Sequence, residues 1–444
     1  MKKKILKIEV CFLIFLAISS CSRYDSENDF RFGYAGGMFS QSLNNNSEIN
    51  IIEYIGSNQV VRIPPKINKL PVTRIGNNAF SEKNLTSVTI PNTVVSIGDN
   101  AFSSNQLSEI TIPDSVTYIR KGAFSENQLT SVSIPDNVNE IDEKAFWRNN
   151  LTSVRIGNGI SKIGKDAFGQ NQIIELIIGN SVTLIEDKAF SDNNISNLII
   201  PYNVINIGFA AFMNNQLNNV TFHENLQRIG AHAFKDNQLI TLVIPDSVVI
   251  LDEGAFENNR LTDVTIGNGI TYIAARLFMD NRLEIINIPD NVREIRNQAF
   301  KNNNLKSVVF SDRIHNIGTE AFMDNQINSV VFPDSIRGID DRAFMNNKLT
   351  NLVIPDIERR VILISSPISI GGMTFFNNNL TSVIIPDSVS YIGNRAFAEN
   401  ELNRITLESG TISRSLQEIF GIQFQVEYNI PGSYILNNDY FILE

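Results

Sequence analysis

The sequence repeats itself every 22 residues, and this period constrains the fold more than any other feature. Leu or Ile recurs at one position of each unit without a slip from Leu85 to Leu349, and the period resumes at Leu380. The interval between Leu349 and Leu380 is nine residues too long, which places an insertion within 357–368. A unit of this size cannot bury its own apolar side chains, so the units have to stack. The repeating positions are 85, 107, 129, 151, 173, 195, 217, 239, 261, 283, 305, 327, 349, 380 and 402.

Each unit has two halves with different hydrophobic patterns. In the first half, Leu85 and Val88 belong to an alternating run typical of a strand with one buried face, and a Pro or Gly ends the run. In the second half, Ile97, Ala101 and Phe102 have a spacing that predicts one short helical turn packed inward. The sequence therefore predicts an α/β solenoid, a right-handed superhelix of about fifteen units with a parallel β-sheet on its concave face.

Two columns of identical side chains are expected inside this stack. Fifteen of the 28 Phe, among them Phe102, Phe124 and Phe146, lie five residues before the repeating Leu and are predicted to stack on one another. Asn lies two residues before the Leu in 14 of 15 units, as at Asn105 and Asn127. We expect these amides to be buried and to bond the backbone of the turns, which is a structural role and not a catalytic one.

The N-terminal segment predicts export. Four Lys among the first seven residues precede an apolar run at 10–18, which is too short to cross about 30 Å of hydrocarbon. The sequence Ile-Ser-Ser-Cys ending at Cys21 resembles the lipobox of bacterial lipoproteins, which implies a signal peptide at 1–20 and lipid attachment at Cys21. A plain secretory signal and a buried core segment are the alternatives. Loss of the four Lys and Glu9 with the signal would change the net charge from −10 to −13.

Three other segments depart from the repeat. Residues 21–48 are polar and rich in Gly, Ser and Asn, and they predict a flexible tether between the anchor and a solenoid at 49–412. Residues 413–444 abandon the period and are interpreted as a C-terminal cap. The insertion near 357–368 is either a recognition loop or a loop that the stack merely tolerates.

The unit Leu-x-x-Val-x-Ile-Pro-x-x-Val-x-x-Ile-Gly-x-x-Ala-Phe resembles the BspA-type leucine-rich repeats, which are also described from treponemal surface proteins. The resemblance covers about residues 50–412, and the segment from Phe424 to Tyr434 is similar to the closing segment of the family. The column that is Asn here is often Cys in that family, and Asn suits an exported chain because thiols are prone to oxidation. The resemblance implies surface lipoproteins that bind host matrix proteins or proteins of neighbouring bacteria, without indicating a particular ligand.

The residues two and four positions after each repeating Leu are predicted to point away from the core. The column at the fourth position changes from Thr and Ser early in the chain to Ile and Val later. An exposed apolar stripe of this kind can mark a protein-binding site, although β-branched residues also favour strands in their own right. The predicted contact residues are Ile177, Ile199, Val243, Val309, Val331, Val353 and Ile384.

Composition and missing motifs exclude other classes of function. The basic residues are scattered in a chain of net charge −10, so no nucleic-acid partner is expected. Two Cys and three His, at His223, His232 and His315, lack metal-ligand spacing, and we expect neither a metal nor a cofactor. The His are interpreted as surface residues, and Asp340-Asp341 would bind a cation only weakly. Motifs of hydrolases, zinc proteases and phosphate-binding loops do not occur, and an enzyme is not expected.

These observations predict an exported, membrane-anchored lipoprotein of the outer membrane or cell surface. Its expected activity is adhesion through protein binding by the solenoid. A periplasmic or outer-membrane structural scaffold is the second candidate. A glycan-binding module is a weaker third, because aromatic residues are few at the outward strand positions.

Overall fold

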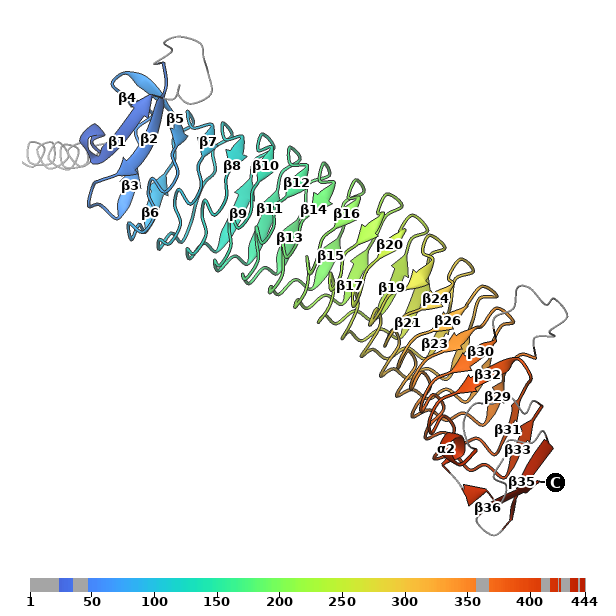
Figure 1. The fold of residues 1–444 in the computed structure, drawn as a ribbon. Coiled ribbons are helices and arrows are strands. Elements are labelled where there is room, and N and C mark those ends of the chain that lie inside the picture. The colour runs from blue at the N-terminus through green and yellow to red at the C-terminus, as the bar shows by residue number, and fades with distance from the viewer. Residues whose placement is uncertain are drawn as a thin grey trace, which may run out of the picture. The chain divides into compact units, whose positions relative to one another are not determined.

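The structure is a computed structural model that describes residues 24–34, 47–356, 367–408, 416–421, 423–424, 432–437 and 440–443. The chain divides into two compact units, Met1–Gly179 and Asn180–Glu444. The period, with its single insertion, predicted one solenoid over 49–412. Each turn of a repeat array contacts only its neighbours, so a long array needs no single shared core. Within each unit, successive turns of chain stack through parallel strands, and the predicted parallel-strand solenoid is confirmed (Figure 1).

In the first unit, parallel strands form two sets, and strands of successive repeats pair at intervals of 22 residues. Val132 of one strand lies beside Val154 of the next, as the repeat requires. Of the strands predicted from the alternating pattern, the first unit contains β6 (Ser87–Thr89), β9 (Ser131–Ile134), β11 (Ser153–Ile156) and β13 (Glu175–Ile177), whereas the repeat that begins at Leu107 forms no strand at this position. β3 (Val60–Arg62) precedes the repeating Leu positions and pairs in parallel with β6. A second parallel ladder consists of β5 (Leu70–Ile75), β7 (Ser96–Ile97), β8 (Tyr118–Ile119), β10 (Glu140–Ile141) and β12 (Lys162–Ile163), and β4 (Lys66–Ile67) pairs antiparallel with β5.

The second unit has the same two sets. The predicted strands are β15 (Asn197–Ile199), β17 (Asn219–Thr221), β19 (Thr241–Ile244), β21 (Asp263–Ile266), β23 (Ile285–Asn287), β25 (Ser307–Val309), β27 (Ser329–Val331), β29 (Asn351–Val353), β31 (Ser382–Ile385) and β33 (Arg404–Leu407). The second set is β14 (Leu184–Ile185), β16 (Asn206–Ile207), β18 (Arg228–Ile229), β20 (Ile250–Leu251), β22 (Tyr272–Ile273), β24 (Glu294–Ile295), β26 (Asn316–Ile317), β28 (Gly338–Ile339), β30 (Ile368–Ile370) and β32 (Val389–Ile392).

The second half of each repeat is not the helical turn that its hydrophobic spacing predicted. Two residues per repeat have positive φ, for example Asn100 at 51° and Ser104 at 54°, and such residues interrupt a right-handed helix. The backbone bonds to the next turn of chain instead, as where the N–H of Phe102 donates to the carbonyl of Ala123 at 2.8 Å. Among the described residues, α-helix is confined to α2 (Leu416–Phe420) and 3-10 helix to η1 (Glu27–Asp29).

The predicted Phe column occupies the interior of both units. The rings of Phe102 and Phe124 are parallel within 7° with centroids 5.3 Å apart, and Phe146 continues the stack at 5.3 Å from Phe124. In the second unit, Phe322 and Phe344 are 5.1 Å apart. All five side chains are fully buried, so this one sequence position forms the centre of the core in both units.

The predicted Asn column lies beside the Phe column and bonds only backbone atoms. The amide nitrogen of Asn105 donates to the carbonyls of Phe80 in the preceding turn (2.8 Å) and Phe102 in its own turn (3.0 Å). Its oxygen accepts the N–H of Leu85 at 2.9 Å. Asn127 repeats the same bonds one turn later. Each Asn thereby satisfies backbone groups of two turns that would otherwise be buried without partners.

The N-terminal end of the stack corrects the prediction of a flexible tether over 21–48. Residues 27–34 form η1 and then β1 (Phe30–Tyr34), which pairs antiparallel with β2 (Ile49–Tyr54), and β2 pairs in parallel with β5. Phe30 is buried with its ring 5.6 Å from that of Tyr54. Tyr54 stacks on Phe80 at 5.5 Å and extends the aromatic column by one member. The polar composition of the segment concealed this cover, because it depends on a single buried Phe.

The C-terminal end of the stack is covered by residues outside the period. Phe420 of α2 stacks on Phe397 at 5.3 Å and is fully buried. β35 (Gly432–Asn437) pairs antiparallel with both β33 and β36 (Tyr440–Leu443), and β34 (Gln423–Phe424) pairs with β36. The edge of the last repeat strand is therefore paired.

The signal segment 1–20 and Cys21 lie outside the described residues, as does most of the insertion, at 357–366. The repeats on either side of the insertion still stack directly. Phe344 and Phe375 are 5.8 Å apart, and the oxygen of Asn378 accepts the N–H of Leu349 at 3.0 Å. The inserted residues therefore leave both interior columns continuous.

Candidate interaction surface

Four apolar side chains occupy the same outward position on four successive repeats of the second unit. Val309, Val331, Val353 and Ile384 lie at or near the ends of β25, β27, β29 and β31, and we name them the apolar column. Their exposed fractions range from 44% for Val353 to 63% for Val331. Val331 and Val353 are direct partners in the parallel register. These side chains leave the core because successive residues of a strand point to opposite faces.

One flank of the apolar column is polar and uncharged. The outward position two residues earlier on each strand holds Ser307, Ser329, Asn351 and Ser382. Hydroxyl and amide groups can exchange water for a partner's hydrogen bonds at little cost, whereas charged groups lose more solvation when they are covered. The column and its flank together suit contact with a protein surface.

The three other predicted contact residues are exposed without forming a continuous column. Ile177 in the first unit is 56% exposed, and Ile199 and Val243 in the second unit are 73% and 65% exposed. Thr221 lies between the repeats of Ile199 and Val243, and Thr265 follows Val243. Single exposed apolar side chains are common on protein surfaces, so these positions carry less weight than the apolar column.

A shallow hollow of about 340 Å³ lies on the same face between β17 and β19. Thr221 and Val243, both in the outward position four residues after a repeating Leu, line it. Glu224, seven residues after a repeating Leu, lines it as well. Side chains at these two offsets therefore share one surface, although they come from a strand and from the following turn.

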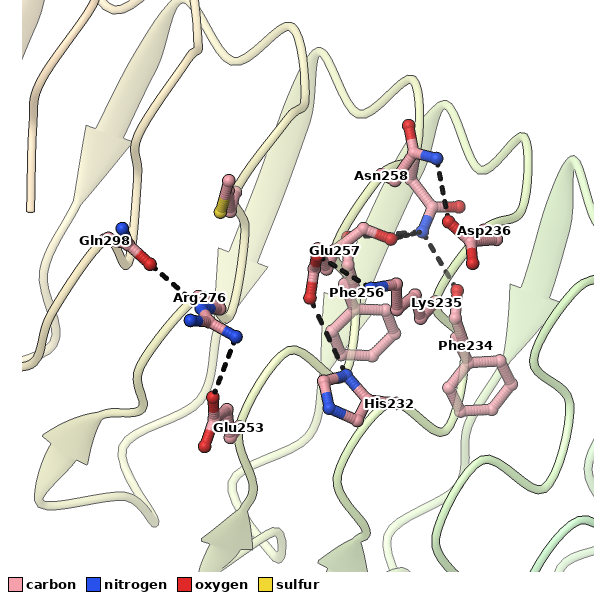
Figure 2. Close-up of polar contacts among 12 residues, drawn as sticks. His232, Phe234, Lys235, Asp236, Glu253, Phe256, Glu257, Asn258, Arg276 and Gln298 are labelled. Atoms are coloured by element: carbon pink, nitrogen blue, oxygen red, sulfur yellow. Dashed lines mark hydrogen bonds and ion pairs between the residues drawn. The ribbon is translucent and has the colours of Figure 1, made fainter.

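The opposite half of the repeat carries a cluster of charged side chains, shown in Figure 2. The ammonium of Lys235 is 2.8 Å from Oε1 of Glu257, and Nδ1 of His232 is 3.6 Å from Oε2 of the same carboxylate. Only 11% of the Glu257 side chain is exposed. The position of Gly254, at φ 58°, has to lack a side chain, because a Cβ there would lie 2.5 Å from Nδ1 of His232. These contacts join two successive repeats and indicate a structural role.

His232 is half-buried, which corrects its interpretation as a surface residue. The contact with Glu257 was missed because the two residues are 25 positions apart. Lys235 and Glu257, however, both follow the repeated Phe directly and are separated by one period. Alignment of the repeats by column would have shown this opposite-charge pair.

A second cluster surrounds Glu320. Hydrogen bonds from Lys301, Gln298 and Arg342, with the Lys301 bond the strongest, lower the pKa of Glu320 to about 2 against the opposing effect of burial. Burial raises the pKa of nearby Asp340, and a hydrogen bond from Asn316 opposes that shift. The carboxylate of Asp341 accepts the N–H of Gly372 at 2.6 Å. The Asp340-Asp341 pair therefore has backbone and amide partners, and its two carboxylates have different surroundings.

Within the described ranges, no three His, Cys, Asp or Glu side chains gather closely enough to hold a metal ion. The same ranges contain no helix that is both long and apolar enough to span a bilayer.

The family of this repeat is indicated by a sequence model of the BspA type leucine rich repeat region, which matches residues 73–196, 183–306, 293–362 and 358–438. Comparison with curated proteins gives no match. A leucine-rich repeat protein from Bacteroides ovatus is 20% identical over 81% of this chain and 94% of its own, with a TM-score of 0.50, and supports the fold. A leucine rich cell surface protein from Faecalibacterium prausnitzii is 24% identical over 74% of this chain and 94% of its own, with a TM-score of 0.43. The pneumococcal vaccine antigen PcpA is 18% identical over 90% of this chain and 91% of its own, also with a TM-score of 0.43.

Proposed function

Because the chain belongs to the BspA type leucine-rich repeat family, we propose that it is an exported, surface-displayed protein whose solenoid binds other proteins through the apolar column. The expected ligands are host matrix proteins or surface proteins of neighbouring bacteria. A lipid on Cys21 is proposed to hold the protein at the outer membrane or cell surface. No catalytic group, metal or cofactor takes part in this function.

The single observation that carries the proposal is the exposure of the apolar column on four successive repeats. Strand formation does not require apolar residues there. In the first unit the same outward position holds Thr89 in β6 and Ser133 in β9, and both strands pair as the later ones do. The valines of the second unit are therefore not explained by strand propensity alone.

The length of the apolar column limits how much of a contact it can form. Four repeats spaced about 4.8 Å apart span roughly 14 Å between the first and last strand. A stable interface covers about 800 Å² on each partner, which is more than four side chains expose. We therefore expect the column to form the apolar centre of a contact that also includes polar residues of adjoining repeats.

The test of binding is the double variant Val331→Lys, Val353→Lys. We expect at least about a tenfold loss of affinity for immobilised matrix proteins or intact bacterial cells, because two charges would be buried in the contact. The matched control is Thr89→Lys, Ser133→Lys, which adds the same charges at the equivalent position of the first unit. Unchanged binding by a folded Val331→Lys, Val353→Lys variant would remove the apolar column from the function.

The anchor and the exposed location need separate experiments. Mass spectrometry should find acyl chains on Cys21 of the wild-type protein, and Cys21→Ala should release the chain from membranes. An unmodified wild type, or full membrane retention of Cys21→Ala, would contradict the anchor. Protease added to intact cells should cleave the solenoid. Protection from protease would favour the periplasmic scaffold instead.

A further inference from the structure

A column of carboxylates accompanies the apolar column on the same repeats. Asp312, Asp334 and Asp356 each follow a residue of the apolar column by three positions, and Asp387 has the same relation to Ile384. All four Asp are exposed. We name Asp312, Asp334 and Asp356 the acidic column.

The acidic column borders the same surface as the apolar column. The hollow beside β19 shows the geometry, because Glu224 and Thr221 line it together with Val243. Glu224 and Thr221 lie seven and four residues after the repeating Leu217. Asp312 and Val309 lie at the same two offsets after Leu305. A partner that covers the apolar column therefore meets these carboxylates along one edge.

Among the described residues, the cations that follow Asp312 and Asp334 bond other acceptors. The guanidinium of Arg313 donates to the amide oxygen of Asn291 at 3.3 Å. The guanidinium of Arg337 donates to the backbone carbonyls of Asp334 and Ile336. Within the part of the chain that the structure describes, no ion pair or side-chain hydrogen bond joins the three carboxylates to another residue. Neighbouring Asp residues of one charge repel each other, and cations of a partner would relieve this repulsion.

Two carboxylates on the opposite half of the repeat form ion pairs within the chain. Glu257 and Glu320 each contact a Lys at 2.8 Å or less, so the chain neutralises them internally. The acidic column is thus distinguished by having no ion pair with any described residue, together with its position beside an exposed apolar stripe. This combination is complementary to a surface that carries aliphatic and cationic side chains in adjacent rows.

The spacing of the repeats favours one kind of partner element. Parallel strands are about 4.8 Å apart, and side chains three or four residues apart on a helix are about 5–6 Å apart. An extended strand that crosses the repeats in the same direction would place side chains of one face about 6.6 Å apart. This spacing differs more from the distance of about 4.8 Å between repeats than the helical spacing does. From this spacing and charge, we infer that the surface formed by the apolar and acidic columns binds a basic amphipathic α-helix of a protein partner. The inference rests on the proposed function and specifies its ligand.

The probe for this inference is a labelled synthetic peptide of about five helical turns, with Leu along one stripe and Lys along the next. Its binding to the full chain is measured by fluorescence anisotropy. Asp312→Asn, Asp334→Asn, Asp356→Asn should weaken binding at least about tenfold, and added salt should weaken the wild type more than this variant. The matched control, Asp114→Asn, Asp136→Asn, changes the same offset in the first unit, where Thr111 and Ser133 replace the valines. It should bind like the wild type.

Two further peptides separate specific docking from general attraction. A peptide with Glu in place of Lys should not bind, and a peptide with Lys but Ser in place of Leu should bind at least about tenfold more weakly. The inference would be overturned if either peptide bound the wild type as tightly as the Leu and Lys peptide does, or if the triple Asn variant bound that peptide as tightly as the wild type does. If the triple variant keeps its affinity for matrix proteins or cells while Val331→Lys, Val353→Lys loses it, the inference fails and the proposed function stands. If neither variant loses affinity, both fail.

Discussion

Three successive repeats of the first unit hold Thr89, Thr111 and Ser133 at the outward position four residues after the repeating Leu, whereas three successive repeats of the second unit hold Val309, Val331 and Val353 there. The inward positions do not differ between the units, because Phe and Asn stack in both. The comparison shows that stacking fixes the interior and leaves the outer face free to diverge. A difference confined to the outer face therefore indicates function more directly than anything in the core.

The largest loss of stability is expected from substitutions in the interior that both units share. Phe124→Ala in the first unit and Phe322→Ala in the second should each destabilise the local stack by about 3–5 kcal/mol, because each leaves a cavity in a fully buried column. Urea denaturation combined with hydrogen exchange measures the loss around each site. If the two variants differ by more than about 2 kcal/mol, the interiors of the two units are not equivalent.

The Asn column should give the next largest effect. Asn127→Ala and Asn347→Ala should each destabilise by about 1–3 kcal/mol, because backbone groups of two adjoining turns lose their buried partners. The N–H of Leu107, which Asn127 accepts, should exchange faster with solvent. Gln128→Ala, at the exposed neighbouring position, is the control. Equal stability of Asn127→Ala and Gln128→Ala would contradict the structural role.

Acid should weaken the second unit more than the first. The pKa of Glu320 is lowered to about 2 in the folded chain, so its stabilising effect is present above the usual Glu pKa near 4.5 and is lost as the pH falls toward 2. In the first unit, a hydrogen bond from Lys121 also lowers the pKa of Glu143. Glu320→Gln should therefore reduce the change in urea midpoint between pH 6 and pH 3 more than Glu143→Gln does. The opposite ranking would show that the Glu320 cluster is not the more stabilising one.

The smallest effect is expected where the units differ. Val331→Ser, Val353→Ser gives the second unit the kind of side chain that the first has at Ser133, and the stability should change by less than about 1 kcal/mol. Partner binding should still fall, because the apolar contact is lost. Thermal unfolding and affinity are measured on the same preparation. A large loss of stability would show that the valines serve the fold.

Particular residues show how much of this structure the sequence could predict. The period predicted the strand register from Val132 to Val154 and the burial of Phe102 and Asn105, because each depends on a neighbour one period away. The prediction of a helical turn was wrong. Positive φ recurs at positions such as Asn100 and Ser104, but the residue type there varies between repeats, so the sequence does not reveal it. Phe30 and Phe420 were missed because they cover the ends of the stack from outside the period.

The candidate surface was predicted in part. Alternation along the strands predicted the outward direction of the apolar column correctly. The charge pattern around it was not predicted, because it depends on which acceptors Arg313 and Arg337 bond in the folded chain. Ion pairs such as Lys235 with Glu257 depend on the same choice, although their separation of one period was visible in the sequence.

The sequence by itself determined the stack, its register and the composition of its interior, because identical units one period apart can bury their apolar faces only against each other. The tertiary structure alone decided three features. Backbone bonds between successive turns replaced the expected helical turn, Phe30 covered the N-terminal end from outside the repeat, and Arg313 and Arg337 bonded acceptors other than the carboxylates beside the apolar column. Each of these depends on which partner a group meets in the folded chain, and the period alone does not determine that partner.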